Sequence, residues 1–160
     1  MRLTVAVALV AAVFVVPAAS SSELVAVSFL GDGILVHEGT GQTQVVDVRF
    51  EGALERTHAP FPNAAFVGQG ALVVDAETGE IEAPVAISIS ALVQDVAGRH
   101  VESWTVSFAG EGDVVSSGTA TLSGADDFLR GAGTSEVRVF SGPQHGRYDL
   151  AFAGLAEAFR

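Results

Sequence analysis

The fold is decided by residues 81–108, which read IEAPVAISISALVQDVAGRHVESWTVSF. Every second position of the first half is apolar, from Ile81 to Val93. This alternation of period two is typical of a strand that buries one face. A helical face can also be drawn through the segment, but Pro84 would break that helix and the segment is rich in β-branched residues. We therefore predict two long strands joined by a tight turn at Ala97-Gly98.

The second strand of this hairpin carries its largest side chains on one face. Taking every second residue gives a first set, His100, Glu102, Trp104, Val106 and Phe108, and a second set, Val101, Ser103, Thr105 and Ser107. Side chains at alternate positions of a strand share a face. Because the second set is small and mostly polar, we expect it to face solvent and Trp104 to point inward.

The rest of the chain has the pattern of further strands separated by turn residues. We expect strands at 24–30, 34–37, 43–51, 66–75, 114–122, 135–140 and 147–153, the last of them extended or followed by a helical turn at 155–159. Gly31-Asp32-Gly33 is predicted to be a turn and 124–133 a compact connection. Eight or nine strands at this spacing predict an all-β fold. Long strands that contain glycine favour a single antiparallel β-barrel of about eight strands, with a β-sandwich as the alternative.

Composition excludes several classes of function. The chain has 160 residues, enough for one domain, and its 49% hydrophobic content is too high for a disordered chain. It has no cysteine, which excludes disulfides, thiol nucleophiles and cysteine-based metal sites. It also has no lysine, and 8 arginines against 19 acidic residues give a net charge of -11. This balance argues against binding to nucleic acid or to an anionic membrane surface.

Residues 1–20 have the pattern of a signal peptide. Arg2 precedes an apolar run that ends at Val16 and is too short to span a bilayer, and small residues then allow cleavage after Ala18 or Ser20. We therefore expect residues 21–160 to form the mature barrel domain, secreted or periplasmic and free of the membrane after cleavage. An uncleaved membrane anchor is the alternative, because the positively charged region holds a single charge.

Residues 118–134, GTATLSGADDFLRGAGT, carry a family resemblance. They resemble the strand-turn-strand signature of the allene oxide cyclase and dirigent-like β-barrel proteins, with matching positions at Leu122, Gly124, Phe128, Gly131, Ala132 and Gly133. The resemblance implies an eight-stranded antiparallel barrel with a central apolar cavity that shapes a small molecule without a cofactor. Ser123 departs from the glycine pair of the family and Asp126-Asp127 from its turn, and no catalytic residue of the family has a matched position here.

The leading candidate site is the face that carries His100, Glu102 and Trp104. If this face lines the barrel interior, an imidazole, a carboxylate and an indole converge there, where they can hold and protonate a small apolar molecule while Glu102 orients His100. Tyr148 is expected to keep its hydroxyl at the mouth of such a cavity. The alternative is structural: Trp104 fills the core, and His100 and Glu102 lie at the wet end of the strand.

Other chemistries lack support in the sequence. The four histidines, His37, His58, His100 and His145, do not have the spacing of a metal motif, and we predict no metal site. Acidic turns such as Asp126-Asp127 do not build a calcium loop. The chain contains no G-x-S-x-G motif and, without lysine, no phosphate-binding P-loop.

Two functions fit these patterns. The first is a secreted barrel that binds a small apolar ligand, with or without a cofactor-free cyclase, isomerase or dirigent-like action. The second is a non-catalytic secreted structural or interaction domain. The size of the interior cavity separates them, because an open apolar cavity of roughly several hundred Å³ favours the first function and a filled interior favours the second.

Overall fold

A computed structural model of the chain describes residues 24–57, 62–77 and 79–159. These residues form eight strands: β1 Leu24–His37, β2 Thr43–Thr57, β3 Asn63–Ala76, β4 Gly79–Val96, β5 Arg99–Ala109, β6 Val114–Ala125, β7 Phe128–Val139 and β8 Gly146–Phe159. The predicted signal peptide and His58 lie outside the described residues. The described part of the chain contains no helix that is long and apolar enough to cross a membrane.

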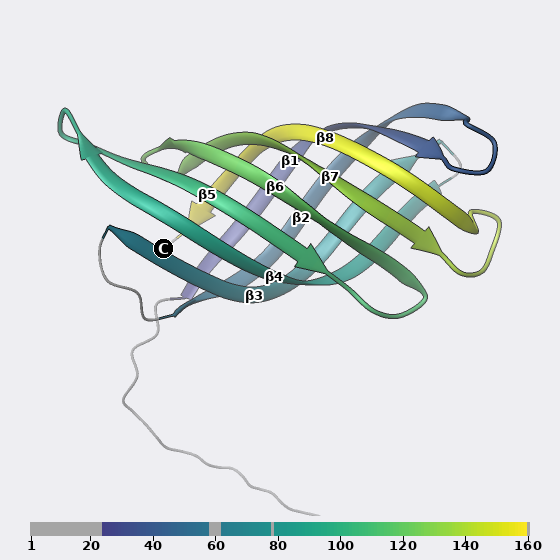
Figure 1. Cartoon of the computed structure of the whole chain (residues 1–160), viewed down its shortest axis with the longest axis horizontal. Helices are drawn as coiled ribbons and strands as arrows, with labels where there is room; N and C mark the ends of the chain where they lie inside the picture. The colour runs from purple at the N-terminus through teal and green to yellow at the C-terminus, as the bar shows by residue number, and fades with distance from the viewer. Residues whose placement is uncertain (1–23, 58–61, 78, 160) are drawn as a thin grey trace, which may run out of the picture.

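The strands form a closed antiparallel barrel in which each strand pairs with its neighbours in sequence (Figure 1). β1 closes the barrel by pairing with β8, with Leu30 opposite Leu155. Closure gives each described strand a partner on both sides, although residues 79–85 of β4 and 114–117 of β6 extend beyond their pairing with β5. The predicted all-β barrel of eight strands is confirmed, and the sandwich alternative is wrong.

The hairpin of β4 and β5 confirms the prediction from the central stretch. β4 spans 18 residues and pairs with β5 so that Ala91 lies opposite Trp104. Its turn residues Ala97 and Gly98 have φ values of 52° and 82°. Positive φ at both central positions is the requirement of a type I′ turn, whose twist matches that of the flanking strands.

Two predicted breaks in the strands are wrong. Gly31 and Gly33 lie inside β1, which continues without a turn to His37. Residues 124–133 are not a separate connection, because β6 continues to Ala125, β7 begins at Phe128, and only Asp126-Asp127 reverse the chain. The described residues therefore form eight strands, and Leu155–Phe159 extends β8 rather than forming a helical turn.

The glycines within strands mark places where neighbouring backbones approach too closely for a side chain. A Cβ atom built on Gly31 would lie 2.1 Å from the carbonyl oxygen of Ala153. On Gly131 it would lie 1.9 Å from the carbonyl oxygen of Thr121. Glycine removes this clash and allows the sheet to bend sharply as it closes.

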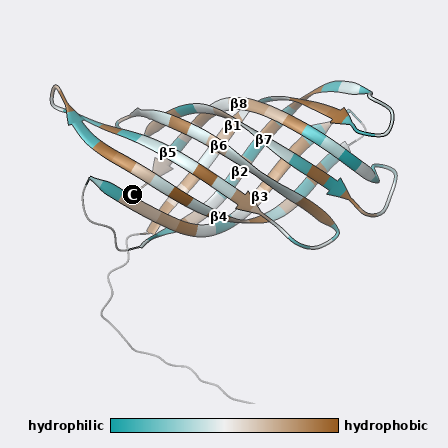
Figure 2. Ribbon diagram, in the orientation of Figure 1, coloured by the Kyte–Doolittle hydropathy of each residue, from teal (hydrophilic) through white to brown (hydrophobic). Residues whose placement is uncertain are grey.

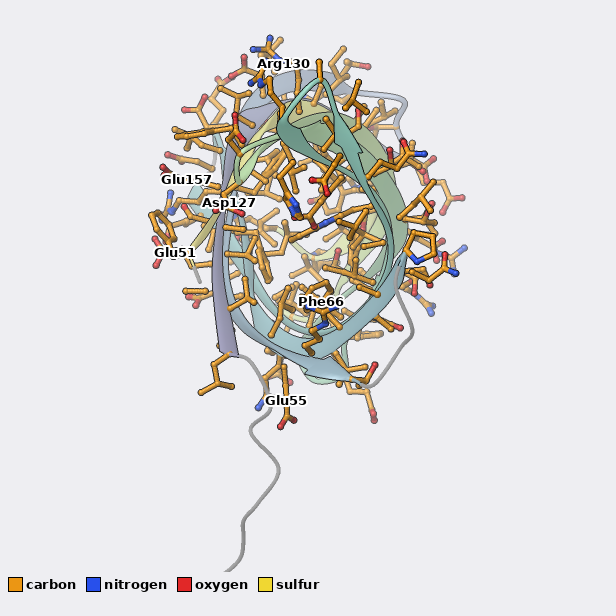
Figure 3. The ribbon with its side chains drawn as sticks, turned by 90° about the vertical axis from the view of Figure 1, so that its left-hand side faces the viewer. Glu51, Glu55, Phe66, Asp127, Arg130 and Glu157 are labelled. Atoms are coloured by element: carbon orange, nitrogen blue, oxygen red, sulfur yellow. The ribbon has the colours of Figure 1, made fainter. Side chains whose placement is uncertain are left out.

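Alternation along each strand separates an apolar interior from a mixed exterior, seen as bands of hydropathy in Figure 2. In the view along the barrel in Figure 3, Phe66 lies inside the barrel, whereas Glu51, Arg130 and Glu157 lie outside. The predicted outward face of β5 is confirmed for Ser103, Thr105 and Ser107, which are exposed. The prediction that Trp104 points inward is also confirmed, since its side chain is 2% exposed.

The two ends of the barrel differ in the residues that occupy them. At one end, called here the Trp104 end, β4 turns into β5 and β8 terminates (Figure 1, left). At the other, called here the Tyr148 end, β1 terminates and β8 begins, so that His37 lies opposite Tyr148. Because successive strands run in opposite directions, the start of β5 and the start of β8 lie at opposite ends.

Candidate functional site

The interior of the barrel contains a cavity of about 70 Å³. The described residues that line it all have apolar or aromatic side chains: Val27, Phe29, Phe50, Leu54, Leu72, Val85, Ile87, Ile89, Trp104, Val106, Phe108, Ala120, Leu122, Phe152 and Ala156. They come from every strand except β7, so the cavity is a property of the closed barrel and not of one hairpin.

Aromatic rings form much of the cavity wall. Phe152 packs edge-on against Phe29, with ring centroids 5.7 Å apart and an interplanar angle of 78°. It also contacts Phe108 at 6.4 Å. Such tilted arrangements place the positive edge of one ring near the negative face of another, which favours this packing over a parallel sandwich.

Interior glycines make room for two of these rings. A Cβ atom on Gly52 or Gly70 would lie 2.5 Å from Cζ of Phe50, and one on Gly133 would lie 2.7 Å from Cζ of Phe152. The rings therefore lie against bare backbone, and the glycines shape the cavity as well as the bends of the sheet. Phe50 and Phe152 were not predicted to be cavity residues. For Phe50 the available signal was the glycine two positions later on the same strand, Gly52. The glycine beside the Phe152 ring is Gly133 on the neighbouring strand, which the local sequence does not indicate.

The predicted cluster on β5 is present at the Trp104 end. His100, Glu102 and Trp104 project from the same face because they are two positions apart. The indole Nε1 of Trp104 donates to Oε1 of Glu102 across 2.7 Å. Oε2 of Glu102 lies 2.8 Å from Nε2 of His100. The cluster therefore bonds both carboxylate oxygens of Glu102 to its two neighbours.

Exposure changes sharply along this cluster. The side chain of Glu102 is 4% exposed, whereas that of His100 is 42% exposed. His100 Nδ1 also faces the solvent-exposed Asp95, with 4.0 Å between Nδ1 and Oδ1. A buried carboxylate needs hydrogen-bond donors to offset its lost hydration, and Trp104 supplies one directly. The structural alternative is thus half right: His100 is at the wet end, but Glu102 is buried.

Trp104 connects the polar cluster to the cavity. Its indole ring lines the cavity and packs against Phe66, with ring centroids 5.7 Å apart. Its one polar group is already bonded to Glu102. Neither Glu102 nor His100 lines the cavity. The arrangement therefore positions an aromatic wall and does not place an acid or a base in the cavity.

Tyr148 lies at the other end of the barrel from this cluster. Its hydroxyl donates to the backbone carbonyl of Gln144 across 2.6 Å, and its ring meets that of His37 edge-on at 5.1 Å. Burial raises the pKa of the Tyr148 hydroxyl above its ordinary value. The structure does not bring Tyr148 together with His100, Glu102 and Trp104. The Tyr148 side chain does not line the cavity either.

A second buried polar pair was not identified from the sequence. Ser116 and Ser135 lie on adjacent strands, are both buried, and have hydroxyl oxygens 2.6 Å apart. The Ser135 hydroxyl also lies 3.2 Å from the backbone carbonyl oxygens of Ser117 and Glu136, to either of which its one hydrogen can be donated. Because these hydroxyls satisfy one another and the backbone, they have a structural explanation and lie outside the cavity lining.

Within the described ranges, histidine, aspartate and glutamate side chains do not gather into any group of three that would hold a metal ion. No protein-family model matches the chain, and no curated protein matches it either. The resemblance of residues 118–134 to allene oxide cyclase and dirigent-like barrels therefore stays a prediction. In the structure this segment is the β6–β7 hairpin.

Proposed function

We propose that the protein is a secreted β-barrel that binds a small apolar molecule in its interior. The observation that supports this function is the cavity within the closed barrel, whose described lining is wholly apolar or aromatic. Apolar cavities stay dry, and filling one with an apolar molecule restores the dispersion contacts that its wall atoms lack.

The size of the cavity limits the ligand. Its volume of about 70 Å³ is several times the roughly 10–15 Å³ that one water molecule requires. It is well below the roughly 300–1,000 Å³ of pockets that enclose drug-sized ligands. The cavity therefore does not reach the several hundred Å³ that would by itself have favoured ligand binding, and the ligand that fits is a compact molecule of a few carbon atoms or a single small ring.

Binding without chemistry is the function that the geometry favours. A cofactor-free cyclase or isomerase needs an acid or base within hydrogen-bond reach of its substrate. His100 and Glu102 are the candidates, but Trp104 stands between them and the cavity and engages Glu102. We therefore propose a carrier or sequestering role, and a cyclase-like role would require movement of Trp104.

The proposed location outside the cytoplasm rests on the signal-like pattern of residues 1–20. A net charge of -11 favours solubility in this setting.

Probe binding tests the proposal. Toluene and xenon should bind the purified protein, and amide and methyl NMR signals of the cavity residues should shift on titration. Ala120→Leu fills the cavity and should abolish these shifts. Ala132→Leu makes the same change on the outer face of β7 and should leave them intact. If neither probe binds to the wild-type protein, the proposed function is overturned.

A non-catalytic structural or interaction domain is the second candidate. It is favoured by how completely large side chains fill the rest of the barrel, including Trp104, Phe66 and Leu150, each at most 2% exposed. For this function the cavity would be a packing defect. Ala120→Leu would then raise the midpoint of thermal unfolding while leaving every binding property of the wild-type protein unchanged.

A further inference from the structure

We infer that the cavity selects molecules without hydrogen-bonding groups, and that Glu102 sets this selectivity by engaging the indole N–H of Trp104. This inference rests on the proposed ligand-binding function and specifies its ligand class as unsubstituted hydrocarbons, aromatic ones in particular.

The cavity wall offers no free hydrogen-bonding partner among its described side chains. Trp104 is the one lining residue that carries a polar group, and its Nε1 is 2.7 Å from Oε1 of Glu102. The backbone offers little more, because every lining residue except Val85 is paired with a residue on both neighbouring strands. A ligand hydroxyl placed in the cavity would lose its bonds to water and gain none.

The cost of this loss decides the preference. An apolar pocket rejects a molecule that adds only a hydroxyl by on the order of a hundredfold at most. Toluene and phenol have nearly the same shape and differ in a methyl against a hydroxyl group. We expect toluene to bind at least about tenfold more tightly than phenol. The rings of Phe29, Phe108 and Phe152 provide edge and face contacts to an aromatic guest.

Glu102 acts on the ligand only through Trp104 and is therefore a positioning residue. Without its carboxylate, the indole would lose the bond that holds its N–H toward Glu102 and away from the cavity, and a turned ring would be able to donate to a hydroxylated ligand. Glu102→Leu removes the acceptor and keeps an apolar side chain at a position that is 3% exposed. Glu102→Gln retains an acceptor oxygen and serves as the matched control. His100→Ala is a second control, because it leaves the bond between Trp104 and Glu102 intact.

The test is an NMR titration of the full protein with toluene and with phenol. Trp104 is the only tryptophan, so the single indole N–H signal belongs to it. The wild-type protein, Glu102→Gln and His100→Ala should prefer toluene by about tenfold or more. Glu102→Leu should reduce this ratio severalfold, with a shift of the indole signal on phenol binding that the wild-type protein does not show.

Three results would overturn the inference. The first is that the wild-type protein binds phenol as tightly as toluene. This result overturns the inferred selectivity but agrees with the proposed binding function. The second is an unchanged ratio in a folded Glu102→Leu protein. The third is a phenol-induced shift of the indole N–H signal in the wild-type protein that indicates a direct hydrogen bond to phenol. This result overturns the inference even if Glu102→Leu does not fold. Absence of binding by both probes overturns the proposed function together with this inference.

Discussion

Trp104 and Glu102, two positions apart on β5, are joined by a hydrogen bond of 2.7 Å from the indole Nε1 to the carboxylate Oε1. This bond fixes the ring of Trp104 against the cavity and directs its polar edge toward the barrel end. It also supplies a donor to a carboxylate that would otherwise be buried at a high cost. One interaction therefore satisfies two buried polar groups and, in the selectivity proposed above, keeps the indole N–H away from the cavity.

Removal of this carboxylate should destabilise the protein. Glu102→Ala leaves the buried indole N–H without its acceptor and should lower the free energy of unfolding by about 1–3 kcal/mol. Urea denaturation followed by tryptophan fluorescence measures the change. Glu82→Ala removes an exposed carboxylate from the outer face of β4 and should change stability by less than about 0.5 kcal/mol. Equal effects of the two substitutions would contradict the structural role of Glu102.

Gly131 should tolerate no side chain. A Cβ atom at this position would lie 1.9 Å from the carbonyl oxygen of Thr121, and only movement of the β6 or β7 backbone would relieve the clash. Gly131→Ala should therefore cost about 3 kcal/mol or more, the upper range for overpacked sites. Thermal unfolding by circular dichroism measures this loss.

Gly41 provides the matched control for that substitution. It lies in a turn with a φ of 71° and has no heavy atom within 4 Å of the position a Cβ would occupy. Gly41→Ala should cost only the conformational penalty of a left-handed alanine, about 1–2 kcal/mol. If Gly131→Ala were the milder of the two substitutions, close strand approach would not explain the interior glycines.

The β4–β5 turn should be open to improvement. Ala97 has a φ of 52°, a conformation that alanine adopts at a cost and asparagine adopts more readily. Ala97→Asn creates the Asn-Gly pair that type I′ turns prefer and should raise stability by about 0.5–1 kcal/mol. Ala97→Val, which places a β-branched residue at positive φ, should lower stability instead. Differential scanning calorimetry of the two variants checks the predicted difference in sign.

Stability should fall at alkaline pH through Tyr148. Burial raises the pKa of its hydroxyl above the unfolded value near 10. The folded protein thus keeps a proton that the unfolded chain releases. The contribution of Tyr148 to stability is full below about pH 10 and is lost as pH rises through the folded pKa.

Tyr148→Phe should flatten this part of the pH profile of stability, because it removes the titrating group. It should also cost about 1 kcal/mol at neutral pH through the lost bond to the Gln144 carbonyl. Tyr148 is the only tyrosine, so the phenolate absorbance of the native protein reports its titration directly. A native titration at or below the ordinary tyrosine value would contradict the prediction.

Several features of the fold were predictable because they depend on local alternation. The parity of apolar residues in 81–108 placed Trp104 inward and Ser103 outward, as observed. The same parity placed His100 and Glu102 on the face of Trp104. Prediction failed at glycines: Gly31 and Gly33 were assigned to a turn, although they lie within β1. Their role depends on a contact with β8, more than a hundred residues away in sequence, which no local pattern contains.

The sequence by itself determined the faces of the strands, since the two-residue repeat of a strand is a property of the backbone. It therefore determined that His100, Glu102 and Trp104 stand side by side. Only the tertiary structure decided what lies behind them, because the volume inside a barrel depends on how side chains from distant strands pack once the sheet closes. That closure produced a cavity of about 70 Å³ lined by Trp104 and placed Tyr148 at the opposite end of the barrel.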